Sequence, residues 1–117
     1  MHYKEEGCNL NMNLKKLYEK IFYRSIRSDL KYEEATQIIA SQKSVVIDVR
    51  TPEEYNKKHY EGAINIPLYE IERVENEIKN KDELIFLYCK VGQRSEMAKQ
   101  ILMQNGYKNI YTFDAKV

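Results

Sequence analysis

Two short segments carry apolar residues on both faces of an extended chain, and they limit the possible folds more than any other feature. They are residues 45–49, with the sequence VVIDV, and residues 84–88, with the sequence LIFLY. Such strands have to be covered on both faces, as happens in a parallel sheet flanked by helices. The two segments therefore predict an α/β fold built on a central parallel sheet.

Most of the remaining chain has the apolar spacing of amphipathic helices. Helices are predicted over residues 32–41, 69–80 and 95–105, and a short one begins at Thr51-Pro52. Asp29 is placed to cap the first of these helices, and Gly106 to end the last in the left-handed conformation. Shorter strands are predicted over residues 62–67 and 109–113. This alternation predicts right-handed βαβ units with helices on both faces of the sheet.

The length of 117 residues fits one domain with a short extension. Residues 1–28 are predicted to form the extension, with an amphipathic helix over about residues 14–25. The apolar stripe of that helix consists of Leu14, Leu17, Tyr18, Ile21 and Phe22. Residues 29–117 are predicted to form the α/β domain.

The charges nearly cancel, because the chain has 19 Lys and Arg and 18 Asp and Glu. Neither nucleic acid nor a membrane is an expected partner, since no overall field would attract them. No apolar run approaches the roughly 20 residues of a membrane helix, and the N-terminus lacks the apolar core of a signal peptide. The expected location is the cytoplasm, where Cys8 and Cys89 would be free thiols. No metal site is expected, since neither His2 nor His59 clusters with a cysteine.

The segment from Cys89 to Ser95 combines a nucleophile with the features of an anion site. Cys89 follows a predicted buried strand, at the sheet edge where open parallel sheets bind ligands. Gly92 permits a tight turn whose amide groups can converge on an anion, and the next helix adds its positive end. This setting favours the thiolate form of Cys89. Lys90 and Arg94 add positive charge, and Arg94 can grip an anion with two hydrogen bonds.

Four pieces of the sequence, in order and at matching spacing, resemble the rhodanese-homology domain family. They are residues 46–50, residues 53–59, residues 62–67 and the Cys89-x-x-Gly92-x-Arg94-Ser95 motif. The resemblance covers roughly residues 29–113 and implies a rhodanese-like sheet with helices on both faces. It also implies a single-domain sulfurtransferase of the thiosulfate type.

In the mechanism that the resemblance implies, the Cys89 thiolate takes the outer sulfur of a small anionic donor such as thiosulfate. Sulfite leaves, and a thiol or a protein acceptor then removes the sulfur from the Cys89 persulfide. No cofactor is expected. The substrate-binding residues would be those of the loop, namely Lys90, Val91, Gly92, Gln93 and Arg94. The alternative function is a persulfide carrier or regulatory module that acts with a protein partner.

The length of the loop argues against phosphatase or arsenate reductase chemistry. Cys-dependent phosphatases, including those with a rhodanese fold, place five residues between the cysteine and the arginine. This chain places four between Cys89 and Arg94, which suits a single sulfur atom on the cysteine better than a tetrahedral phosphate. Tyr88 also stands where phosphatases place a histidine.

Several candidate residues also have a purely structural explanation. Asp48 and Arg50 lie at a strand end beside the loop, and an ion pair that supports neighbouring loops is favoured over a catalytic role. His59 is expected to be a structural turn residue, and Cys8 a bystander rather than a second reactive thiol. Arg94 could be a solvated residue of the helix N-terminus, although a cation there opposes the helix dipole.

The sequence departs from the family pattern at two places. Lys58 stands before His59, where the family usually has glycine. The family normally continues beyond the last strand with a Gly-Gly turn and a segment that often contains tryptophan, so the domain is expected to be short at its C-terminal end. We expect the helix over residues 14–25 to cover part of the surface left bare, in a monomer, or a homodimer to form through it.

Overall fold

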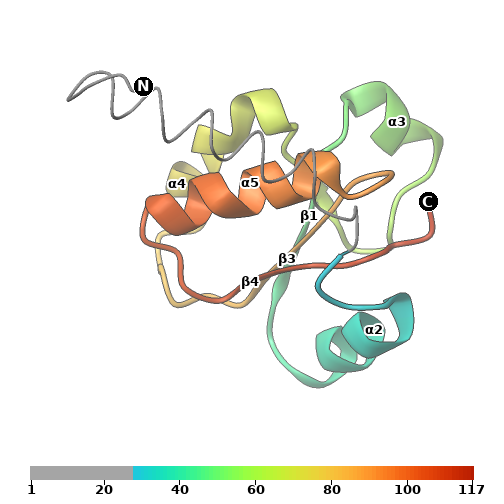
Figure 1. The fold of residues 1–117 in the computed structure, drawn as a ribbon, viewed down its shortest axis with the longest axis horizontal. Coiled ribbons are helices and arrows are strands. Elements are labelled where there is room, and N and C mark those ends of the chain that lie inside the picture. Colours follow the sequence, from blue (N-terminus) through green and yellow to red (C-terminus); the bar gives the residue numbers. More distant parts are fainter. Residues whose placement is uncertain (1–27) are drawn as a thin grey trace, which may run out of the picture.

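The computed structural model describes residues 28–117, which form a four-stranded parallel sheet with the strand order β2-β1-β3-β4 (Figure 1). The strands are β1 (Val45–Asp48), β2 (Ile64–Asn65), β3 (Ile85–Tyr88) and β4 (Ile110–Thr112). All three strand pairs are parallel. The predicted α/β architecture is therefore confirmed, and the predicted helix over residues 14–25 lies outside the described residues.

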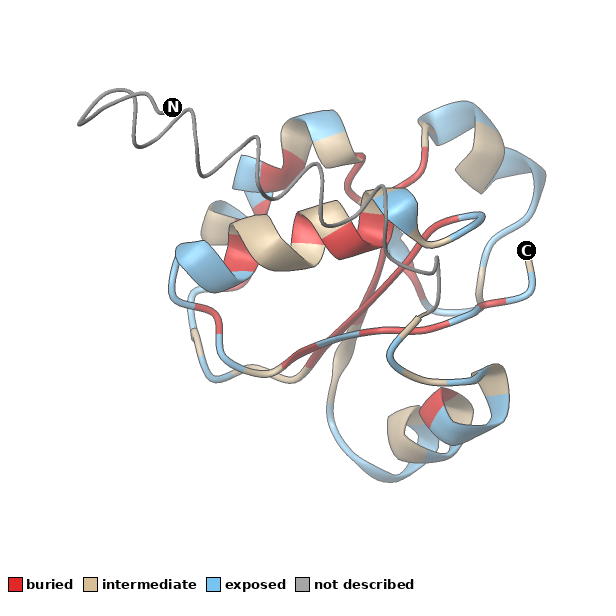
Figure 2. Ribbon diagram, in the orientation of Figure 1, coloured by how far each residue is buried: buried red, intermediate tan, exposed pale blue. Residues whose placement is uncertain are grey.

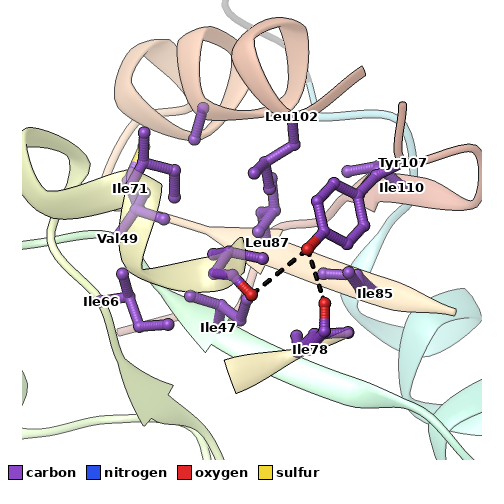
Figure 3. Close-up of a cluster of buried hydrophobic side chains, with 13 residues drawn as sticks. Ile47, Val49, Ile66, Ile71, Ile78, Ile85, Leu87, Leu102, Tyr107 and Ile110 are labelled. Atoms are coloured by element: carbon purple, nitrogen blue, oxygen red, sulfur yellow. Dashed lines mark hydrogen bonds between the residues drawn. The ribbon is translucent and has the colours of Figure 1, made fainter. Parts of the chain in front are cut away.

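Helices cover both faces of the sheet, as the apolar strands require. The helical segments are α2 (Tyr32–Ser41), α3 (Pro52–Lys57), the 3-10 helix η1 (Leu68–Arg73), α4 (Val74–Glu77) and α5 (Gln93–Gln104). On one face α5, η1 and α4 pack over the core that includes Ile85 and Leu87 (Figure 3). On the other face α2 packs over Phe86 and Tyr88. All four residues of β3 are buried, so this central strand is enclosed on both sides (Figure 2).

The chain between β2 and β3 is not the continuous helix predicted over residues 69–80. It forms η1 with a kink at Glu70, then a single turn of α4, and Ile78 is extended. Because α4 is a single turn, carbonyl oxygens at its two ends can accept hydrogen bonds from other parts of the chain. The hydroxyl of Tyr107 donates to the carbonyl oxygens of Val74 (3.2 Å) and Ile78 (2.6 Å), as Figure 3 shows. The apolar residues at helical spacing, Ile71, Val74 and Ile78, are all buried, but the backbone that carries them is not one continuous helix.

Asp29 does not cap α2, contrary to the prediction. The N-cap residue is Lys31, whose N–H donates to the carboxylate of Glu34 at 2.8 Å. Asp29 instead accepts the N–H of Thr112 at 3.0 Å and forms an ion pair with Lys99 at 2.6 Å. The reason is that the chain just before α2 runs along β4, which draws the Asp29 side chain to the sheet edge.

The start of α3 and the end of α5 are formed by the residues that were predicted to form them. Thr51 caps α3 by accepting the N–H of Glu54 at 3.2 Å, and Pro52 is the first helical residue. Gly106 follows α5 with a φ of 99°, the left-handed stop that was predicted. These caps fix where the loops at the carboxyl edge of the sheet begin and end.

Candidate active site

Cys89 lies at the carboxyl end of the central strand, between β3 and the start of α5. The loop turns at Gly92, whose φ of 101° lies in the left-handed region that favours glycine. The helix begins at Gln93, two residues earlier than predicted. Cys89 is only 5% exposed and belongs to the same core cluster as Leu87. The nucleophile candidate is therefore anchored in the core while its loop reaches the surface.

Backbone N–H groups converge on the sulfur of Cys89. The N–H groups of Gly92 and Ser95 donate to Sγ at 3.1 Å and 3.3 Å. The thiol donates to Oγ of Ser95 at 3.5 Å, and this hydroxyl donates in turn to the carbonyl oxygen of Gly92. Donors aimed at one sulfur stabilise negative charge on it, in a thiolate or on the inner part of a persulfide. The turn at Gly92 thus brings N–H groups together at the sulfur, and the buried hydroxyl of Ser95 lies beside them.

Arg94, expected to grip an anionic donor, is bound to a carboxylate of the protein. Its Nη1 and Nη2 atoms donate to the two carboxylate oxygens of Glu54 in α3, at 2.7 Å and 3.1 Å. Glu54 also accepts the N–H and the hydroxyl of Thr51, at 3.0 Å and 3.2 Å. Above all the hydrogen bonds from Arg94 lower the pKa of Glu54 to about 2. The pair thus links the Cys89 loop to α3 at any pH near neutrality.

This ion pair predicts a pH dependence of stability. The ordinary pKa of Glu54 is 4.5, and the folded protein lowers it to about 2. The stabilisation is therefore full above about pH 4.5 and is lost as the pH falls toward 2. The difference in unfolding free energy between the wild type and Glu54→Gln should be present at pH 7 and shrink below pH 4.5. Denaturant titrations at several pH values measure it, and a difference independent of pH would contradict the prediction.

Asp48 and Arg50 form a buried ion pair beneath the loop. Arg50 donates from Nη2 to Asp48 at 2.7 Å, and the two side chains are 4% and 0% exposed. A second bond from Nη2, at 2.6 Å, reaches the carbonyl oxygen of Lys58, just after α3. The hydroxyl of Tyr88, the residue before Cys89, donates to Asp48 at 2.7 Å. The pair predicted to hold neighbouring loops forms, and it connects the end of β1 to the strand that carries Cys89.

Of the three further loop residues predicted to contact the substrate, Lys90 and Val91 line the groove beside Cys89. Val91 is 57% exposed at the turn, and Gln93 is also exposed. Nζ of Lys90 donates to the carbonyl oxygen of Val117 at 2.7 Å. His59, which was expected to be structural, stacks its ring on Tyr55 with 3.8 Å between the centroids.

An open groove of about 990 Å³ runs from Cys89 to the start of α2. Among the described residues that line it, Asp29, Glu33, Glu34 and Asp114 are acidic. The basic ones are Lys31, Lys90 and Lys116. The groove is large for thiosulfate and carries charges of both signs, which is a property that the loop motif did not predict.

The structure brings Cys89 and its loop together with Asp48 and Arg50, as predicted, and adds two residues that sequence reasoning did not place in the site. Ser95 lay inside the recognised motif, six positions after Cys89, where a helix start could bring its N–H back to the sulfur. Glu54 lies in the short helix predicted from Thr51-Pro52, and no local pattern predicts its ion pair with Arg94, which is 40 residues away in the chain. Cys8 lies outside the described residues.

Two observations bear on other kinds of site. Within residues 28–117, no group of three or more His, Cys, Asp or Glu side chains is placed to hold a metal ion. In the same part of the chain, no helix is long and apolar enough to cross a membrane.

Comparison with known families agrees with this geometry. The model of the rhodanese-like domain matches residues 31–115, so the chain belongs to the rhodanese-like domain family. Thiosulfate sulfurtransferase PspE of Escherichia coli (strain K12) is 45% identical over 65 residues, which cover 55% of this chain and 62% of that protein. The putative sulfur carrier protein YrkF of Bacillus subtilis (strain 168) is 39% identical over 83 residues, covering 70% and 44%. The chain thus spans between about two fifths and three fifths of these relatives.

Solved structures show the same fold. An E. coli rhodanese with anions aligns with a TM-score of 0.57 and 40% sequence identity, over 62% of this chain and 85% of that one. The human single-domain sulfurtransferase TSTD1 aligns with a TM-score of 0.66, over 75% and 89% of the two chains. Its identity of 22% supports a shared fold alone.

Proposed function

We propose that this chain is a sulfurtransferase that moves a sulfane sulfur from thiosulfate or a similar donor to a thiophilic acceptor through a persulfide on Cys89. The observation that carries the proposal is the convergence of the Gly92 and Ser95 N–H groups on Sγ of Cys89. The relative named as a thiosulfate sulfurtransferase supports the choice of donor. In the expected cytoplasmic location, abundant thiols could act as the acceptor.

The first half of the reaction is a displacement at sulfur. The Cys89 thiolate attacks the outer sulfur of thiosulfate, a new S–S bond forms, and the old one breaks so that its electron pair leaves with sulfite. Cys89 then carries a persulfide anion. The N–H groups that hold Sγ stabilise the charge before the attack, and the open loop leaves room for the added sulfur.

The second half returns the cysteine to its starting state. A thiolate acceptor attacks the outer sulfur of the persulfide, and the S–S bond to Cys89 breaks with its electron pair on Sγ. The products are an acceptor persulfide and the Cys89 thiolate, so neither half needs an external oxidant or a cofactor. Lys90, Val91 and Gly92 line the groove beside Cys89 that donor and acceptor would enter. These three residues and Gln93 are the proposed substrate contacts of the loop, whereas a donor could reach the Arg94 guanidinium only in competition with Glu54.

The direct test is the mass of the protein after incubation with thiosulfate. We expect a gain of one sulfur atom, located by peptide mapping on the fragment that contains Cys89 and removed by cyanide or by a thiol. A gain located on Cys8, or no gain with any sulfane donor, would refute the proposal. Repeated turnover with thiosulfate and cyanide would identify an enzyme.

The second candidate is a persulfide carrier that acts with a protein partner. The size of the groove beside Cys89 and the name of the relative YrkF favour it. A carrier would gain sulfur from a cysteine-desulfurase persulfide but only slowly from thiosulfate. The same mass measurement with the two donors in parallel therefore separates the candidates.

A further inference from the structure

We infer that Glu54 determines the charge of the sulfur donor that Cys89 accepts: by holding Arg94 in an ion pair, it favours donors of low net charge over dianions. The inference rests on the proposed function, because it concerns the donor of that same reaction. Among residues 28–117, the two arginines beside the Cys89 loop, Arg50 and Arg94, are each held by a carboxylate of the protein.

The position of the Glu54 carboxylate is fixed on two sides. Thr51 donates to it from the N–H and from the hydroxyl, while Arg94 binds both of its oxygens. With a pKa of about 2, this carboxylate stays charged throughout the neutral range. An anionic donor that needs the Arg94 guanidinium therefore has to compete with a bound carboxylate, which a dissolved anion does poorly.

Arg94 is close enough to matter for the charge at the sulfur. It lies between Gln93 and Ser95 in the chain, and the Ser95 N–H binds Sγ directly. The pKa of Arg94 is raised chiefly by its hydrogen bonds with Glu54 and, to a smaller extent, by the charge of Cys89. Arg94 is thus part of the first turn of α5, which binds Sγ, and the two hydrogen bonds from its guanidinium to Glu54 offset its charge there.

The groove beside Cys89 does not restore a positive field. Its described lining has four carboxylates and three lysines. Lys116 pairs with Glu33 at 3.3 Å and Asp29 with Lys99 at 2.6 Å, while Lys90 donates to a carbonyl oxygen and keeps its charge. The lining charges of opposite sign therefore nearly cancel. A doubly charged donor therefore gains little electrostatic attraction as it approaches Cys89. A singly charged or zwitterionic donor depends less on such attraction. Persulfides and thiosulfonates of low net charge belong to this favoured class.

The test compares two donors that react in the same way and differ in charge. Thiosulfate is a dianion and releases sulfite, whereas methanethiosulfonate is a monoanion and releases methanesulfinate. In both, the attacking thiolate takes the outer sulfur and the S–S bond electrons leave with the sulfur–oxygen group. The quantity to measure is the ratio of kcat/KM for thiosulfate to kcat/KM for methanethiosulfonate, at low ionic strength.

Glu54→Gln removes the charge but keeps an oxygen that can accept the N–H of Thr51, so the cap of α3 is retained. The ratio is expected to rise about threefold or more, the effect of one charge several ångströms away at a partly solvated site. Glu53→Gln, an exposed change in the same helical turn, is the matched control and should leave the ratio unchanged.

An unchanged ratio in Glu54→Gln, or an equal rise in both variants, would overturn the inference. A lower stability of Glu54→Gln would not by itself alter the ratio, because both donors meet the same folded enzyme. If the wild type takes sulfur from neither donor, the proposed function falls and the inference falls with it. If the wild type is active with both donors and only the ratio fails to move, the proposed function stands without this role for Glu54.

Discussion

Replacing Cys89 with serine is expected to lower the rate of sulfur transfer by a factor of about 10⁴ or more, the scale seen when a nucleophile is removed. A serine hydroxyl is a far weaker nucleophile near neutral pH and cannot form a persulfide. The fold should be retained, because oxygen replaces sulfur at almost constant shape. The free energy of unfolding is expected to fall by no more than about 1–3 kcal/mol, the cost of burying a hydroxyl whose hydrogen bonds are incomplete. Steady-state transfer from thiosulfate to cyanide, together with denaturant unfolding, measures both quantities.

Cys8→Ser is the matched control, since it makes the same chemical change at the other cysteine of the chain. Its activity should equal that of the wild type. If transfer survives in Cys89→Ser, or disappears in Cys8→Ser, then Cys89 is not the nucleophile. Loss of structure in Cys89→Ser would be visible in the unfolding curve and would separate a folding defect from a chemical one.

Replacing Asp48 with alanine is expected to destabilise the protein by about 3–5 kcal/mol, the cost of leaving one member of a buried ion pair alone. Asp48 accepts the N–H of Arg50 at 2.9 Å, the guanidinium of Arg50 at 2.7–3.2 Å and the hydroxyl of Tyr88 at 2.7 Å. Without it, the guanidinium keeps the carbonyl oxygen of Lys58 and its position over the Tyr88 ring, neither of which supplies a negative charge. Urea unfolding at pH 7 measures the loss.

Asp82→Ala is the control for this stability prediction. Asp82 pairs with Lys108 at 3.6 Å, and the two side chains are 68% and 73% exposed. Water screens such a pair, so its removal should change the free energy of unfolding by less than about 1 kcal/mol. Equal effects of the two substitutions would mean that the pair of Asp48 and Arg50 contributes no more than a surface contact.

The sequence predicted those parts of the fold that depend on local pattern. Residues 45–49 and 84–88 had to be covered on both faces, and they became the two central strands of a parallel sheet. Thr51-Pro52 and Gly106 mark a helix start and a helix end through their own backbone preferences. The strand order, by contrast, depends on how distant segments pack, and no local pattern encodes it.

The mistaken or missing parts share one physical cause, which is competition from tertiary partners. Asp29 had the right chemistry for a cap, but the neighbouring strand β4 offered its carboxylate an N–H and a lysine. The helix predicted over residues 69–80 ends early, at Glu77, next to Ile78, whose carbonyl oxygen accepts the Tyr107 hydroxyl. In the site, the sequence identified Arg94 as a cation near Cys89 but not the carboxylate of Glu54 that binds it.

The burial of Cys89 has a consequence for the path that the sulfur takes. The residue extends the central strand, is 5% exposed and packs in the main core, and the N–H of Val49 holds the carbonyl oxygen of Tyr88 just before it. Such a cysteine cannot swing outward like a residue on a mobile arm. The acceptor must therefore have a thiol that protrudes far enough to enter the loop and reach the outer sulfur of the persulfide. Acceptors with a thiol on a slender, flexible stem should therefore be served faster than those with a thiol recessed in a flat surface.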